Sequence, residues 1–123
     1  INPMLHDGQL YGSIIQGIGH TLMEEIVLES GVVANSNLAD YKLPNIIDIP
    51  PLHLTHVRAA KGPGPFDTNG VSELGIGIVA PAIANAIRDA TGARVKRLQL
   101  ISEHVLRALA ETQGPSETQV PGS

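Results

Sequence analysis

A loop rich in glycine and proline, Gly62 to Glu73, is the feature that most constrains the fold of this chain. Its closely spaced prolines exclude a continuous helix or a central strand. Its glycines allow positive φ angles and a close approach of the backbone to a ligand. The loop ends at one carboxylate, Glu73, shortly before the apolar helical pattern of Val79 to Ile87. A glutamate held out of water at such a junction can act as a base, whereas a surface turn with a solvated carboxylate is the alternative.

The composition limits the chain to one domain with an aliphatic core. It has 123 residues, of which 42% are hydrophobic and only 2% aromatic. The formal net charge is −4, so a nucleic-acid partner is not expected. Cysteine is absent, which excludes disulfides, thiolate zinc sites, iron–sulfur ligation and cysteine nucleophiles within this sequence.

The ends of the chain give little information about its location in the cell. No apolar run approaches the roughly 20 residues that a membrane span needs. The sequence opens at Ile1 without a methionine and without a signal-peptide pattern, and it looks cut from something longer. We therefore expect no membrane partner and take a cytoplasmic location as the default.

Helical spacing of apolar residues predicts a first helix from Gly8 to about Leu28. Three glycines, Gly12, Gly17 and Gly19, interrupt this pattern, and each costs about 1 kcal/mol relative to alanine in a helix. Such glycines indicate close packing against another backbone or a ligand, with a frayed or kinked helix as the alternative.

Short extended segments are predicted between the helices. Residues 29–31 form a turn before an extended pair at 32–33. Residues 45–51 cannot form a central strand, because their prolines remove hydrogen-bond donors. Residues 52–59 alternate in polarity and are predicted as a strand, and residues 94–100 are a second strand candidate.

Two further helices complete the prediction, one from about Ile78 to Thr91 and a last one through about Glu111 that Ser102 caps. Pro81 is tolerable only in the first turn of its helix, and Gly92 is a suitable end. The predicted fold class is α+β, with a small mixed sheet packed by about three helices. The ordered domain is expected over residues 1–111, and residues 112–123 are expected to be a disordered tail.

The histidines do not predict a metal site held by side chains. His53 and His56 are three apart on a predicted strand, so they face opposite sides. His20 and Glu24 share a helix face and could supply two ligands, but a structural or surface role for His20 is the favoured interpretation. His6 belongs to no pattern.

Several phrases in order resemble the C-terminal end of the molybdenum-binding subunit of the xanthine dehydrogenase and aldehyde oxidase family of molybdenum hydroxylases. The resemblance runs from residue 1 to about residue 110. The phrases are Ile1-Asn-Pro-Met, Gly8-Gln9-x-x-Gly12-x-x-x-Gln16-Gly17-x-Gly19, Glu24-Glu25, Asn37-x-x-Asp40-Tyr41-x-x-Pro44, Asp48-Ile-Pro50, Gly64-Pro-Phe66, Gly70-Val-x-Glu73 and Ala80-Pro-Ala-Ile-Ala-Asn-Ala.

The resemblance implies one lobe of a molybdopterin-binding domain that takes part in the hydroxylation of aldehydes or N-heteroaromatic carbons, with oxygen from water. By similarity, Glu73 matches the active-site base, and Gln9 matches a glutamine that hydrogen-bonds the cofactor. Gly70 and Val71 would contact the cofactor through their backbone. The implied cofactor is a molybdenum pterin, with the cytosine dinucleotide form as one option.

The resemblance also implies partners. These are the remainder of the molybdenum subunit, iron–sulfur and flavin (FAD) subunits or domains, and a small-molecule substrate. The isolated segment is expected to be inactive. It is also expected to expose surface meant for the rest of the subunit, with the glycine-bearing face of the first helix as a candidate for self-association.

The loop departs from the family pattern, which usually reads Gly-Pro-Phe-Gly-Ala-Lys-Gly-Val-Gly-Glu. Asp67, Thr68, Asn69 and Ser72 stand where glycine, alanine or serine, lysine and glycine are usual. These changes motivate an alternative, namely a cofactor-free degenerate homologue or assembly module without catalysis. An unrelated small-ligand-binding domain is a third interpretation.

Overall fold

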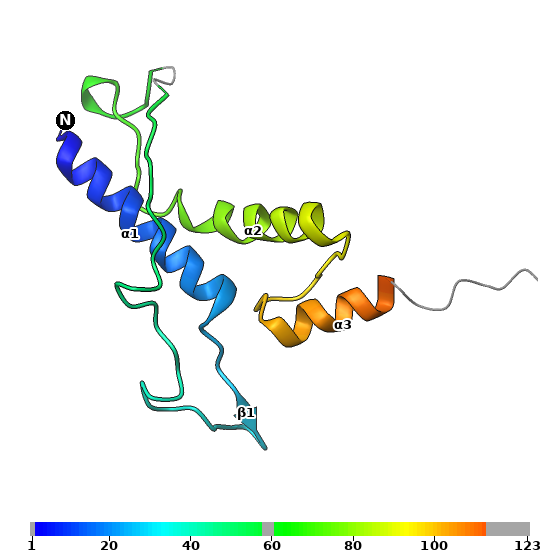
Figure 1. Ribbon diagram of the computed structural model, residues 1–123. Coiled ribbons are helices and arrows are strands. Elements are labelled where there is room, and N and C mark those ends of the chain that lie inside the picture. The colour runs from blue at the N-terminus through cyan, green and yellow to red at the C-terminus, as the bar shows by residue number, and fades with distance from the viewer. Residues whose placement is uncertain (1, 58–60, 113–123) are drawn as a thin grey trace, which may run out of the picture.

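Three helices and one small hairpin make up the fold in a computed structural model, which describes residues 2–57 and 61–112 (Figure 1). In chain order the elements are α1 (Pro3–Leu22), β1 (Leu28–Glu29), β2 (Val32–Val33), the 3₁₀ turn η1 (Pro65–Asp67), α2 (Ile76–Thr91) and α3 (Ser102–Thr112). The prediction of about three helices with a small sheet is confirmed. The sheet is a two-stranded antiparallel hairpin rather than a mixed sheet.

Helix α1 begins and ends earlier than the apolar spacing predicted. The Asn2 side chain accepts a hydrogen bond from the Leu5 amide at 3.2 Å, and Pro3 occupies the first turn, where its missing N–H costs nothing. At the other end, the amides of Met23 and Glu24 both donate to the Gly19 carbonyl, at 2.9 and 2.8 Å. This shared acceptor ends the helix at Leu22, well before Leu28.

Glycines on α1 allow α2 to cross it closely, as one of the two interpretations predicted. A Cβ at Gly17 would lie 2.7 Å from Val79 Cγ2 and 3.2 Å from the Ile76 carbonyl oxygen. Gly75, at the start of α2, packs in the same way against Ser13. Gly12, by contrast, has no neighbour within 4 Å. Close packing therefore explains Gly17 but not Gly12.

The hairpin forms at the predicted turn. Leu28 pairs with Val33 and Glu29 with Val32. Between the strands, Ser30 and Gly31 have φ angles of 50° and 82°, the left-handed pair that a two-residue hairpin requires. The extended pair at Val32–Val33 is thus confirmed.

The two longer predicted strands are wrong in the part of the chain that the structure describes. Residues 52–57 are coil that returns beside α1 toward its N-terminus, while residues 58 and 59 of this prediction lie outside the described range (Figure 1). Residues 94–100 are also coil. The Leu100 amide donates to the Thr21 carbonyl at 2.7 Å, so this segment bonds to the end of a helix instead of to another strand.

Helices α2 and α3 match the predicted ranges within two residues. Because α2 begins at Ile76, Pro81 lies beyond the first turn, where it removes one helical hydrogen bond. Gly92 ends α2 in the left-handed conformation with φ 75°, as predicted, and its amide donates to the Arg88 carbonyl at 2.8 Å. Ser102 is the first residue of α3, not a residue before it.

The apolar core is small, with Val79, Ala93, Leu100 and Ala108 as its buried hydrophobic side chains. An open apolar hollow of about 540 Å³ lies beside the α1–α2 crossing, with Ile14, Ile18, Leu22, Ile78 and Ile83 among its lining residues. The glycine-bearing face of α1, the predicted candidate for exposed surface, is covered by α2 at Gly17 and by Pro44 at Gly19, whereas Gly12 is exposed. Residues 113–123 of the predicted tail lie outside the described range. Among the described helices, none has the length and hydropathy of a membrane span.

Candidate functional site

The N-terminal half of α1 and the glycine-rich loop meet at an open hollow of about 710 Å³. One hydrogen bond joins them, from Gln9 Nε2 to the Ser72 carbonyl at 3.2 Å. The lining residues are Asn2, Leu5, His6, Gln9, Thr68, Asn69, Gly70, Val71 and Ser72. Three of the four residues singled out from the sequence, Gln9, Gly70 and Val71, are therefore brought together here.

The chemistry of this lining fits an anionic, polar cofactor. Among the described residues that line the hollow, none is acidic, and most of the side-chain donors are amides and hydroxyls. A Cβ added at Gly70 would meet no atom within 4 Å, so the backbone of this residue faces open space. Backbone N–H groups in such a loop can cradle anionic groups. Gln9, Gly70 and Val71 could hold a pterin cofactor by these contacts.

Glu73 follows Ser72 directly, but it does not line the hollow and its side chain is exposed. Its carbonyl accepts a long hydrogen bond of 3.4 Å from the Ile76 amide, at the start of α2. The shielding from water that a catalytic base needs is thus not provided by the described residues. The backbone bond nevertheless fixes Glu73 between the loop and the helix.

The loop before this hollow is held by its own hydrogen bonds. The amides of Gly62 and Gly64 donate to the carbonyls of Asp67 and Thr68, both at 3.1 Å. Phe66 and Asp67 have φ angles of 58° and 59°, a left-handed conformation that is uncommon for residues with a side chain. Asp67 stands where the family pattern usually has glycine, the residue that adopts a positive φ angle without steric cost.

The histidine–glutamate pair at the C-terminal end of α1 belongs to a structural network. The prediction that both residues share a helix face is wrong, because α1 ends at Leu22 and Glu24 lies two residues beyond it. Glu24 is 8% exposed and accepts a hydrogen bond from the Tyr41 hydroxyl at 2.7 Å. His20 Nε2 lies 3.5 Å from the same carboxylate. The hydrogen bond to Glu24, with smaller effects of burial and of the negative charge, raises the pKa of Tyr41. Glu24 thus ties the segment containing Tyr41 to the end of α1, in keeping with a structural role for His20.

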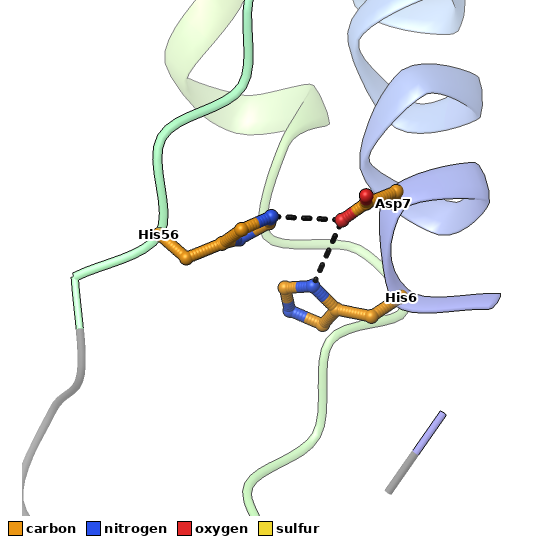
Figure 2. Close-up of side chains that lie close together, drawn as sticks. All are labelled: His6, Asp7 and His56. Carbon is orange, nitrogen blue, oxygen red and sulfur yellow. Dashed lines mark ion pairs between the residues drawn. The ribbon is translucent and has the colours of Figure 1, made fainter. Parts of the chain in front are cut away.

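A cluster that the sequence did not indicate lies at the N-terminal end of α1. His6 and Asp7 on α1 meet His56 from the returning coil (Figure 2). Asp7 Oδ1 is 2.8 Å from His56 Nε2 and 3.7 Å from His6 Nδ1. His56 is far from the other two in sequence, so only the path of the coil brings it here, and no local spacing could have found it.

Comparison with known proteins shows which family this sequence resembles. Residues 1–50 match the family described as the molybdopterin cofactor-binding domain. The chain is 39% identical over 102 residues to the xanthine dehydrogenase molybdenum-binding subunit of Escherichia coli O157:H7, covering 81% of this chain and 14% of that protein. It is 38% identical over 109 residues to the aldehyde oxidoreductase of Megalodesulfovibrio gigas, covering 88% and 12%.

A solved structure shares the fold. Quinoline 2-oxidoreductase from Pseudomonas putida 86 superposes with a TM-score of 0.81 at 27% identity, covering 94% of this chain and 15% of that chain. These matches define the class as a molybdopterin-binding segment. The chain belongs to the xanthine dehydrogenase and aldehyde oxidoreductase family of molybdenum hydroxylases. It spans 12% to 15% of the length of these relatives.

Proposed function

We propose that this chain is the segment of a molybdenum hydroxylase that carries the catalytic base and part of the cofactor site. The proposed reaction is the oxidation of aldehydes or N-heteroaromatic carbons, with water as the oxygen source. The observation that supports it best is the Gln9–Ser72 hydrogen bond. It joins two sequence motifs of the family around one non-acidic hollow and leaves Glu73 as the next residue along the chain.

Each residue has a proposed role. The Gln9 amide and the backbone of Gly70 and Val71 bind and orient the pterin cofactor, which supplies the two-electron redox chemistry when bound. Glu73 accepts the proton released as water oxygen is transferred to the substrate carbon. A carboxylate performs this step best in a site closed to water. We therefore propose that other parts of the protein cover Glu73.

Further partners follow from the family. We propose that the remainder of the molybdenum subunit covers the apolar hollow beside the α1–α2 crossing, because exposed apolar surface of this kind marks an interaction site. Electrons would leave through iron–sulfur and flavin subunits or domains, and the cytosine dinucleotide form of the pterin is one option for the cofactor. On this proposal, residues 1–123 alone are inactive and prone to self-association.

A cofactor-free assembly module is the second candidate function. The specific observation in its favour is the acidic, bulkier loop, with Asp67 and Ser72 at positions where glycine is usual. The Ser72 side chain stands next to the proposed base, where a glycine would leave more room. This candidate predicts the same fold without molybdenum.

Metal and pterin analysis of the intact protein distinguishes the two. We expect about one molybdenum and one pterin per chain in protein purified from a host that makes the cofactor. The measurement is elemental analysis by mass spectrometry, with fluorescence of the oxidised pterin as a second readout. A folded protein without molybdenum, from a host in which a related hydroxylase is loaded, would support the module instead.

The Gln9→Leu substitution tests the cofactor contact. Leucine keeps the approximate volume but removes the amide that donates to the Ser72 carbonyl and lines the hollow. One neutral hydrogen bond contributes about 0.5–1.5 kcal/mol, so we expect a roughly 2- to 10-fold faster loss of pterin during dilution. Gln16→Leu, on the same helix but outside the hollow, is the control. Equal pterin retention in Gln9→Leu and wild type would exclude the contact.

A further inference from the structure

The His6–Asp7–His56 cluster has the composition and spacing of a metal site. Two imidazole nitrogens and one carboxylate oxygen converge from α1 and from the returning coil, and all three ligand atoms lie within 4.8 Å of one another (Figure 2). We propose that these three side chains bind a divalent transition-metal ion of the Zn²⁺ type. This ion would be additional to the molybdenum cofactor.

The distances fit such an ion after small movements. Zinc binds imidazole nitrogen and carboxylate oxygen at about 2.0–2.2 Å, so neighbouring ligand atoms in a tetrahedral site lie about 3.3–3.5 Å apart. In the structure Asp7 Oδ1 lies 2.8 Å from His56 Nε2 and 3.7 Å from His6 Nδ1. The pair of Asp7 and His56 must open and the pair of Asp7 and His6 must close by less than about an ångström. The two imidazole nitrogens lie within 4.8 Å of each other, so they must approach by up to about 1.4 Å.

The central oxygen of the cluster has no hydrogen bond. Asp7 Oδ1 is buried and no donor meets hydrogen-bond geometry, although His56 Nε2 is within 2.8 Å. A buried carboxylate oxygen without a hydrogen bond is costly. A metal ion between the three side chains would satisfy this oxygen, whereas the His56–Asp7 ion pair alone would not give it a well-directed donor.

The ligand set selects the class of metal. Imidazole ligands suit zinc and other first-row transition metals, while Mg²⁺ and Ca²⁺ prefer sites made of oxygen ligands only. The side chains of His6, Asp7 and His56 remain 42%, 43% and 45% exposed, so an ion can enter and keep a water molecule in its fourth position.

The site would connect two segments that the fold otherwise joins weakly. Residues 52–57 are coil without strand partners, and the bound ion would fix this coil to the first turns of α1. His6 also lines the hollow that contains Gln9. The inference does not depend on the proposed reaction, because the cluster contains none of the residues assigned to it.

Zinc binding by the intact protein tests the inference. The purified protein is freed of loosely bound metal, titrated with Zn²⁺ in competition with a chromophoric chelator, and analysed for zinc and molybdenum in the same sample. We expect one zinc per chain that is lost in His56→Ala and in Asp7→Asn. Outer-shell changes already weaken metal affinity about 10- to 100-fold, so removal of a direct ligand should weaken it at least that much.

Two features of the design keep the result interpretable. His53→Ala removes a histidine three residues from His56 that is outside the cluster, and it should keep wild-type affinity. Asp7→Asn keeps the shape of the side chain, so a normal molybdenum content or circular dichroism spectrum shows that this variant is folded. Wild-type zinc affinity in both Asp7→Asn and His56→Ala, or no zinc bound by the wild type, overturns the inference and leaves a simple ion pair.

Discussion

Replacing Glu73 by glutamine is expected to slow turnover by the intact protein strongly while leaving its molybdenum and pterin content unchanged. Glutamine has the same shape but cannot accept the proton that the proposed reaction releases. General-base catalysis contributes about 10²- to 10⁴-fold, so kcat should fall by that factor. The measurement is substrate-dependent reduction of a dye acceptor, with aldehydes and N-heteroaromatic compounds as substrates.

The Glu29→Gln substitution is the matched control. Glu29 is an exposed carboxylate on the hairpin, in strand β1, and it should keep full activity. Separate measurement of cofactor content distinguishes a lost base from a lost cofactor. If Glu73→Gln turns over at the wild-type rate with full molybdenum, Glu73 is not the base, whatever the family of the chain.

Local signals in the sequence predicted the ends of elements where one residue determines the backbone. Ser30 and Gly31 form the hairpin turn, and Gly92 ends α2 in the left-handed conformation, since each position needs a positive φ angle. The start of α1 was missed because apolar spacing begins only at Leu10, whereas the Asn2 cap and Pro3 already form the first turn. Capping is therefore the better guide to that boundary.

The strand predictions failed because strand formation depends on a partner that the sequence pattern does not reveal. Residues 52–57 alternate in polarity, but they lie as coil beside α1, and His56 contacts Asp7 instead of an adjacent strand. Residues 94–100 end at a backbone bond to Thr21, in the last turn of α1. In both cases a helix takes the contacts that a neighbouring strand would have made.

Part of the candidate site could be predicted and part could not. The ordered motifs selected Gln9, Gly70 and Val71, which the structure places around one hollow. The same motifs selected Glu73, whose exposed side chain in this chain gives no independent support for its role. On the proposed function, other parts of the protein would cover Glu73. The proximity of His6 and His56 is likewise a property of the folded chain alone.

The Gly17→Ala substitution is expected to loosen the crossing of α1 and α2. A methyl group at this position would lie 2.7 Å and 2.8 Å from Val79 Cγ2 and Cβ, closer than carbon atoms can approach. Because Val79 is anchored in α2, the two helices must move apart, and overpacking of this kind costs about 1–3 kcal/mol. The helix propensity of alanine returns up to about 1 kcal/mol, so with the full return a net loss of up to about 2 kcal/mol remains.

Hydrogen exchange measured by mass spectrometry on the intact protein reports this loss locally. Peptides from residues 3–22 should exchange faster in Gly17→Ala, by up to roughly 30-fold. Gly12→Ala is the control on the same helix, since a methyl group there meets nothing within 4 Å. Alanine should stabilise α1 at that position by about 0.5–1 kcal/mol, so exchange should slow. Equal changes in both variants would show that helix propensity, rather than contact with Val79, determines the stability of α1.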